Sequence, residues 1–184
     1  MRCPSCLHRM HLSAEECPHC GLTLSSLDGV YAKFDPRVKS PSDRAGVLSV
    51  YQRRKVAKAV AAIEQRFPQL CLRVVTCALG NGQSVQSFGF WLMNRGEFFD
   101  QQDSARADGI VLLVIDVQHK EVCLHFGHLL DAVVDEKESF DLLLKAHPYL
   151  LESSYYEATK VMLAGTRKYL KRLQKRAVRR ALKS

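Results

Sequence analysis

The sequence predicts an α/β domain with a small metal-binding module before it and a long basic helix after it. Three observations support this fold class. Four of the seven cysteines form two Cys-x-x-Cys pairs near the N-terminus. The apolar run Ile110–Ile115 and the alternating segment Glu121–Phe126 indicate two adjacent strands. The stretch Arg167–Lys183 holds nine basic residues and no acidic one. A chain of 184 residues has room for one ordinary domain with such additions.

The positive charge is concentrated in that C-terminal stretch. The formal net charge is +8, yet without the nine C-terminal cations the chain has 18 basic and 19 acidic residues. Any anionic partner is therefore expected to meet the tail first. No apolar run is long enough to cross a bilayer, and the start Met1–Pro4 lacks the apolar segment of a secretory signal. We expect a cytoplasmic protein with no transmembrane segment.

Residues 1–22 are predicted to form a zinc ribbon, because two Cys-x-x-Cys turns can supply four thiolates to one tetrahedral Zn²⁺. The segment is too short to fold on apolar burial alone, so the metal would supply much of its folding energy. Disulfides are the competing interpretation, which a reducing compartment disfavours, and a thioredoxin-like redox pair is a weaker one. His8, His11 and His19 lie nearby in sequence and could replace a thiolate. The predicted ligands are Cys3, Cys6, Cys17 and Cys20.

The first half of the main domain follows from periodicity and capping residues. Residues 23–41 are rich in Ser, Asp, Gly and Pro without a period, and we interpret them as a linker. Ser42 is the expected N-cap of a helix that ends at Pro68. A strand is predicted over Cys71–Leu79, followed by a second helix capped by Ser84.

The centre of the domain is predicted to be a β-hairpin. Ile110–Ile115 is apolar throughout, which indicates a strand buried on both faces. Gln118–Lys120 is short enough for a tight turn, and apolar and polar residues alternate in Glu121–Phe126. Two helices are expected after the hairpin, one ending before Pro148 and one beginning near Ser153. Three cysteines in strand-like segments are interpreted as small core residues: Cys71, Cys77 and Cys123.

The order of these features resembles the TPM domain family. Arg73–Thr76 resembles the first strand of that family, and Asp108–Gly109 before the apolar strand resembles its Asn-Gly. Gly127–Asp131, read Gly-His-Leu-Leu-Asp, stands where the family has Gly-Tyr-Gly-Leu-Glu. Pro148 and then Tyr155 stand where the family has a proline and then Gly-Asp-Tyr, which opens its last helix.

The resemblance covers residues 42–165, and it implies a layered αβα TPM-like domain with a central mixed sheet. Four parts are then expected along the chain. They are a zinc ribbon at 1–22, a linker at 23–41, the TPM-like α/β domain at 42–165 and a basic C-terminal helix extension at 166–184.

Members of the TPM family bind divalent metal, calcium in some, and some are phosphatases. The resemblance implies that Ca²⁺ or Mg²⁺ would lie in an acidic pocket lined by Asp108 and Asp131, with His128 beside them. The chain also departs from the family pattern. Leu129 replaces a family glycine, and Ser154 replaces a family aspartate, which removes a carboxylate ligand. We interpret the pocket as degraded.

The C-terminal stretch predicts an amphipathic helix with a narrow apolar stripe. Such a helix could bind an anionic membrane or a nucleic-acid backbone, or could simply be solvated beyond the part that packs on the domain. Only Tyr169 could stack on a base, so sequence-specific recognition is not expected. The cations predicted to face an anionic surface are Arg167, Lys171, Arg172, Lys175, Arg176, Arg179 and Arg180.

Three functions stay open from the sequence. The first hypothesis is a binding or scaffold protein, because a closed four-thiolate site has no open position for a substrate. In it, the ribbon and the basic helix dock the core on an unknown protein partner or an anionic surface. The alternative is a divalent-metal-dependent phosphatase acting on phosphomonoesters, with Asp108 and Asp131 as ligands and His128 as general acid or base. The second alternative is nucleic-acid or anionic-membrane binding through ribbon and tail together.

Overall fold

The structure is a computed structural model that describes residues 2–8, 10, 15–98, 108–131 and 133–181. Within these residues the strands form one mixed sheet in the order β1-β2-β3-β4. Strands β1 (Ser42–Asp43), β2 (Cys71–Cys77) and β3 (Ile110–Asp116) are parallel, and β4 (Glu121–Phe126) is antiparallel to β3. The predicted hairpin and the mixed sheet are confirmed.

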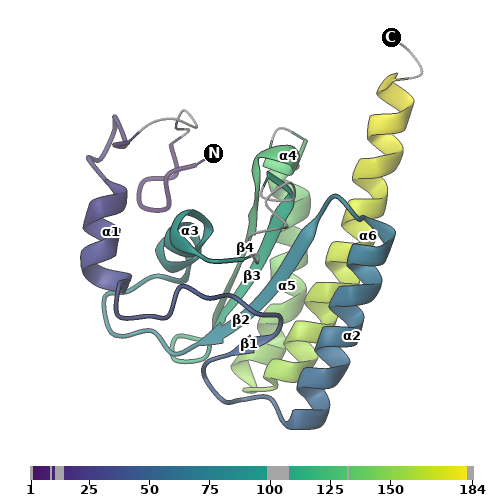
Figure 1. Ribbon diagram of the computed structural model, residues 1–184, viewed down its shortest axis with the longest axis horizontal. Helices are drawn as coiled ribbons and strands as arrows, with labels where there is room; N and C mark the ends of the chain where they lie inside the picture. Colours follow the sequence, from purple (N-terminus) through teal and green to yellow (C-terminus); the bar gives the residue numbers. More distant parts are fainter. Residues whose placement is uncertain (1, 9, 11–14, 99–107, 132, 182–184) are drawn as a thin grey trace.

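Helices cover both faces of the sheet (Figure 1). Helices α2 (Val50–Arg66), α5 (Glu136–Leu151) and α6 (Tyr155–Ala181) form the layer on one face. Helices α1 (Leu24–Tyr31) and α3 (Val85–Arg95) form the other layer, and the short helix α4 (His128–Asp131) follows β4. The αβα layering that the resemblance implied is therefore confirmed.

Strand β3 is buried along its whole length, as its apolar sequence predicts. Alternate residues point to opposite faces. Val111 and Leu113 belong to the core under α2, α5 and α6, whereas Leu112 and Val114 belong to the core under α1 and α3. Two separate hydrophobic cores thus share this strand, which explains why it carries no polar residue before Asp116.

The start of the first long helix was predicted wrongly. Ser42 and Asp43 form β1, which pairs with Val75 and Thr76 of β2, and helix α2 begins only at Val50. Asp43 still caps the turn before the helix, since its carboxylate accepts hydrogen bonds from the backbone amides of Val47 and Leu48. The N-cap itself is Ser49, which forms a capping box with Gln52.

The interpretation of residues 23–41 as a linker without regular structure was wrong in its first part. Helix α1 begins there with a capping box between Thr23 and Ser26. Tyr31 is only 2% exposed and packs against Phe88 and Trp91 of α3. The segment is short, and its packing partners are distant in sequence, so tertiary contacts stabilise a helix that local periodicity does not indicate.

The helix predicted to end before Pro148 continues through it. Helix α5 ends at Leu151, with Pro148 in its last turn. Leu150 is fully buried, and this burial outweighs the hydrogen bond that proline cannot donate. The last helix begins at Tyr155, as predicted, and it continues without a break to Ala181. The expected domain boundary at residue 165 therefore falls inside α6.

His125 on β4 is a partly buried base whose ring nitrogen Nε2 is buried. Its ring packs against Gly89 of α3, where a Cβ atom would clash with it, and Nε2 has no hydrogen-bond partner within the described residues. Burial lowers the pKa of His125 to about 4, although a hydrogen bond with the backbone of Gln86 acts in the opposite direction.

This burial predicts acid sensitivity. The unfolded chain has an ordinary histidine pKa of about 6.5, so between there and about 4 it binds more protons than the folded chain. Stability should therefore fall as the pH falls through this window, by at most about 1.4 kcal/mol per pH unit from this group. Urea unfolding measured at about pH 7, 5.5 and 4.5 should show a shallower dependence in His125→Gln than in the wild type. Equal slopes would contradict the assignment.

Candidate metal centre

The N-terminal segment forms two turns with the same hydrogen-bond pattern. The carbonyl of Cys3 accepts from the amide of Leu7 at 3.0 Å, and the carbonyl of Cys17 accepts from the amide of Gly21 at 2.9 Å. In both turns the residue after the second cysteine has a positive φ, 61° at Leu7 and 70° at Gly21. Glycine adopts this conformation freely, so the second turn is relaxed, and the first carries the strain of a side chain. In each turn, the two cysteines of the pair therefore place their thiols on the same side of the turn.

The four predicted ligands converge. Their sulfur atoms all lie within 4.8 Å of one another. Sγ of Cys3 lies 3.6 Å from Sγ of Cys20, and Sγ of Cys6 lies 3.6 Å from Sγ of Cys17. A tetrahedral ion with bonds of about 2.3 Å to sulfur needs sulfur atoms about 3.8 Å apart. All seven cysteines are free thiols in this structure, and the four that converge could hold a metal ion, which favours the metal interpretation over the disulfide one.

The thiols influence one another's protonation. At Cys17 burial raises the pKa, but hydrogen bonds from the backbone amides of His19 and Cys20 and from neighbouring thiols outweigh it and lower the pKa to about 7. At Cys6 a backbone hydrogen bond at His8 lowers the pKa, but burial and the three other thiols together raise it to about 12. The four sulfurs are so close that ionising one makes it harder to ionise the others. A bound cation would remove this repulsion between neighbouring thiolates.

Of the nearby histidines, neither His8 nor His19 replaces a thiolate. His8 and His19 are exposed and stack on each other, with ring centroids 3.9 Å apart, while cysteine supplies all four converging atoms. His11 lies outside the described residues. The ribbon is tied to the main domain by Arg2, whose guanidinium forms an ion pair with Glu136 at the start of α5. The sequence offered no signal for that contact, because it joins exposed residues far apart in the chain.

The residues of the implied acidic pocket lie at one edge of the sheet. Gly127 follows β4, and its amide donates to the carbonyl of Ile110, while its Cα lies against the carbonyl of Asp108. This contact places the backbone of Asp108 against Gly127, the residue before His128, and both Asp108 and His128 are exposed. Asp131 ends α4, and its side chain lies outside what the structure describes. Among the described residues, the cysteine cluster is the only group of three or more potential ligands close enough to share a metal ion.

The end of α6 extends away from the rest of the molecule (Figure 1). Up to Leu173 the helix alternates buried and exposed positions, but every residue from Gln174 to Arg179 is exposed. Arg172 and Arg176 form ion pairs with Glu138 of α5. The seven predicted cations are exposed except Arg180, whose side chain is not described. No helix in the described part of the chain is both long and apolar enough to span a membrane.

Tyr169 does not fit the stacking role that the sequence left open. It is 1% exposed, and its hydroxyl contacts the backbone of Asp135. Burial raises the pKa of Tyr169, so it stays protonated at neutral pH. Its ring therefore belongs to the core and cannot meet a nucleic-acid base.

Comparison with family models decides the relationship. The model of the TPM domain matches residues 41–169, which is more than half of the chain. The chain belongs to the TPM domain family. No curated protein matches the sequence. Among solved structures, the solution structure of the N-terminal domain of a protein from P. gingivalis is similar with a TM-score of 0.54. It has 16% identity and covers 78% of this chain and 87% of that chain, which supports the fold alone.

The matched TPM region includes all four strands of the described sheet and ends at Tyr169, inside α6. Two features lie outside it: the cysteine cluster and the exposed end of the basic helix. These are the features in which this TPM-domain protein adds chemistry to the family fold.

Proposed function

We propose that this TPM-domain protein is a binding protein that holds a structural zinc ion in its ribbon and docks on an anionic surface through the end of α6. The observation that carries the proposal is the run of six exposed positions from Gln174 to Arg179, in the part of α6 from Arg167 onward that contains no acidic residue. The zinc assignment is supported by the four cysteine thiols, the ligand set that closed structural zinc sites use.

The cations of α6 divide into two groups by their contacts. Arg172 and Arg176 are engaged with Glu138, so they hold α6 against α5. Lys171, Lys175 and Arg179 follow one another at intervals of four residues, and thus lie on one face of the helix. All three are exposed, and they have no ion-pair partner within the described residues. This face, which we call the basic stripe, is the proposed contact.

The stripe recognises charge rather than shape or sequence. Leu170 and Leu173 are buried in the domain, which leaves Val178, 53% exposed, as the one large apolar side chain on the described end of the helix. One valine gives little insertion into a lipid interior. We therefore expect binding that weakens steeply as salt rises, since neutralised phosphate charges release counterions.

The test compares two triple variants with the same change in charge. Lys171→Glu, Lys175→Glu and Arg179→Glu together reverse the stripe, whereas Arg54→Glu, Lys58→Glu and Arg66→Glu reverse three exposed cations on α2. Binding to phosphatidylserine vesicles by sedimentation, and to duplex RNA by gel shift, is measured over a salt series. We expect the stripe variant to lose at least about tenfold in affinity, since each cation near an anionic membrane contributes about 1 kcal/mol.

The α2 variant should lose much less than the stripe variant. Equal losses in the two variants would mean that only net charge matters, and the absence of binding at low salt would remove the proposal. The two probes also decide which phosphate-bearing surface is preferred.

A further inference from the structure

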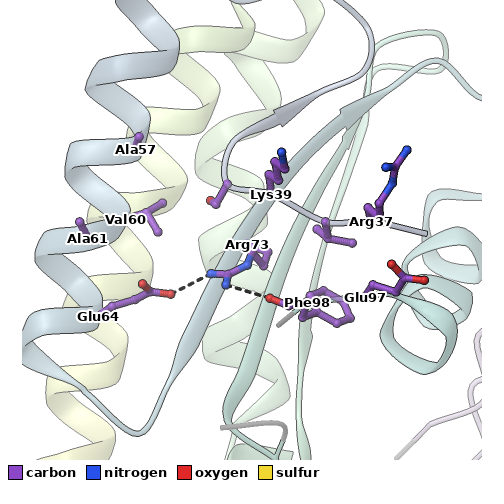
Figure 2. Close-up of a pocket in the computed structure, with 11 residues that line it drawn as sticks. Arg37, Lys39, Ala57, Val60, Ala61, Glu64, Arg73, Glu97 and Phe98 are labelled. Carbon is purple, nitrogen blue, oxygen red and sulfur yellow. Dashed lines mark hydrogen bonds and ion pairs between the residues drawn. The ribbon is translucent and has the colours of Figure 1, made fainter. Parts of the chain in front are cut away.

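A groove lies between helix α2 and the segment that leads into β1. Strand β1 pairs only with Val75 and Thr76, so no described strand covers the first half of β2 on this side. The groove has a volume of about 510 Å³, which lies in the range of small-molecule sites. Figure 2 shows it above Arg73 of β2, with α2 on one side and residues 37–40 on the other.

Arg73 is held rigidly in this groove and keeps one donor unused. Its Nη1 donates to Glu64 at 3.0 Å and to the carbonyl of Leu72, and its Nη2 donates to the carbonyl of Phe98 at 3.1 Å. The side chain is 17% exposed. Its Nε is buried and has no hydrogen-bond partner among the described residues. A fixed, charged donor without an acceptor is costly unless a ligand supplies one.

Two more buried side-chain groups without partners lie in the same region. Oγ of Ser40, which also lines the groove, has no partner, and neither does Nη1 of Arg44. Arg44 does not line the groove, but its Nη2 donates to the carbonyl of Arg37, which does. Of the five buried side-chain atoms that lack a partner in the described part of the chain, two are thus donors on residues that line the groove. Buried donors are normally hydrogen-bonded, so we expect a ligand to supply an oxygen acceptor here.

The charges around the groove favour an acceptor with one negative charge. Its lining includes three cations and two carboxylates: Arg37, Lys39, Arg73, Glu64 and Glu97. Lys39 is exposed on the rim and has no ion-pair partner within the described residues. Glu64 lies directly beside Arg73, and would repel a doubly charged phosphate more strongly than a carboxylate.

The wall on the α2 side is apolar. Ala57, Val60 and Ala61 form it, and they follow the helix away from Glu64 (Figure 2). Small side chains there leave room for a hydrocarbon chain beside the helix. The groove therefore combines a donor-rich floor with an apolar side, which is the arrangement that ligands with one charged end and one apolar end require.

We propose that this groove binds a small organic carboxylate. The carboxylate lies at the floor of the groove beside Arg73 and Ser40, whose Nε and Oγ lack acceptors, Lys39 covers it from the rim, and the hydrocarbon part lies along Ala57 and Ala61. This inference is independent of the zinc site and of the basic stripe, and it would stand if either of those assignments failed.

The test uses the full-length, metal-loaded chain and hexanoate as the probe. Binding is measured by calorimetry and by ligand-observed NMR, with hexanol and inorganic phosphate as comparison ligands. Ala61→Trp fills the wall of the groove, whereas Ala62→Trp adds the same bulk at the next, exposed position that does not line it. We expect hexanoate to bind, and Ala61→Trp to weaken it at least about tenfold while Ala62→Trp leaves it unchanged.

The charge is tested in the same way. Lys39→Gln should weaken hexanoate about threefold, as expected for one exposed charge, and Lys55→Gln, at an exposed position of α2 that does not line the groove, should not. Ser40→Ala should weaken it further, because a donor to the carboxylate is lost. The proposal would be overturned if hexanoate did not bind, or if the two tryptophan variants had equal effects. It would also be overturned if hexanol bound as tightly as hexanoate, or if phosphate bound more tightly.

Discussion

Removal of the metal from the ribbon is expected to unfold residues 1–22 while the TPM domain stays folded. The ribbon core consists of Cys3, Met10 and Cys17, and among the described residues only the partly buried Leu22 packs against both it and a hydrophobic core of the sheet. So small a cluster cannot offset the entropy of ordering its chain, whereas zinc binding to four thiolates supplies about 10–16 kcal/mol. The exposed pair of Arg2 with Glu136 is worth at most about 1 kcal/mol, so it will not hold the segment in place.

Two neighbouring substitutions make the test specific. Cys20→Ser removes a ligand, and His19→Ala removes an exposed ring that the structure places outside the ligand set. We expect one zinc per wild-type chain, more than about hundredfold weaker zinc binding in Cys20→Ser, and unchanged binding in His19→Ala. Metal content by atomic absorption and amide exchange of residues 2–8 and 15–22 would measure these effects. Retention of protected ribbon amides after chelation would contradict the expectation.

The pH dependence of zinc binding follows from the same thiols. Zinc binds thiolates, so binding at neutral pH must release the protons of those thiols that are still protonated. Burial raises the pKa of Cys3, and the pKa of Cys6 is about 12, so these two thiols carry protons in the metal-free state, while Cys17, with a pKa of about 7, is partly protonated. Affinity should therefore rise with pH across the neutral range, and it should fall fastest as the pH drops below about 7, where Cys17 also becomes protonated.

The sequence predicted those parts of the fold that are determined by residues close to one another along the chain. The hairpin follows from a run of apolar residues beside an alternating one, and helix α3 follows from Ser84, whose side chain accepts a hydrogen bond from the amide of Ser87. The cysteine cluster is local too, because the Cys-x-x-Cys spacing determines each turn and only the meeting of the two turns is tertiary.

The parts that sequence reasoning missed depend on distant partners. Helix α1 is held by Asp28, which accepts hydrogen bonds from Trp91 and Arg95, more than sixty residues further along the chain. Asp28 and Arg95 form an ion pair, and the Arg95 guanidinium lowers the pKa of Asp28. No local sequence pattern predicts this pair. Strand β1 likewise exists only because β2 offers an edge to pair with. The groove above Arg73 was missed for the same reason, since an unused donor can be recognised only once its neighbours are known.

Asp116 is expected to give the largest stability loss among single substitutions at polar positions. It ends β3 with no exposed surface, yet it carries a carboxylate. Its Oδ1 accepts hydrogen bonds from the backbone amides of Leu79 and Gln118 at 3.0 and 3.1 Å, and its Oδ2 contacts Nδ1 of His119. One side chain thus joins the segment after β2 to the turn of the hairpin. Asp116→Ala would leave buried amides without an acceptor, at a cost of about 3–5 kcal/mol.

Graded substitutions separate the role of the charge from the role of the hydrogen bonds. Asp116→Asn keeps an oxygen that can accept from both backbone amides and loses the charged contact with His119, so we expect a smaller loss of about 1–2 kcal/mol. Glu121→Ala, in the same hairpin but exposed, should change stability by less than about 0.5 kcal/mol. Urea unfolding at constant pH measures all three. If Asp116→Ala cost no more than Glu121→Ala, the buried carboxylate would not be what joins the hairpin to β2, and the backbone ladder between β2 and β3 would have to be sufficient by itself.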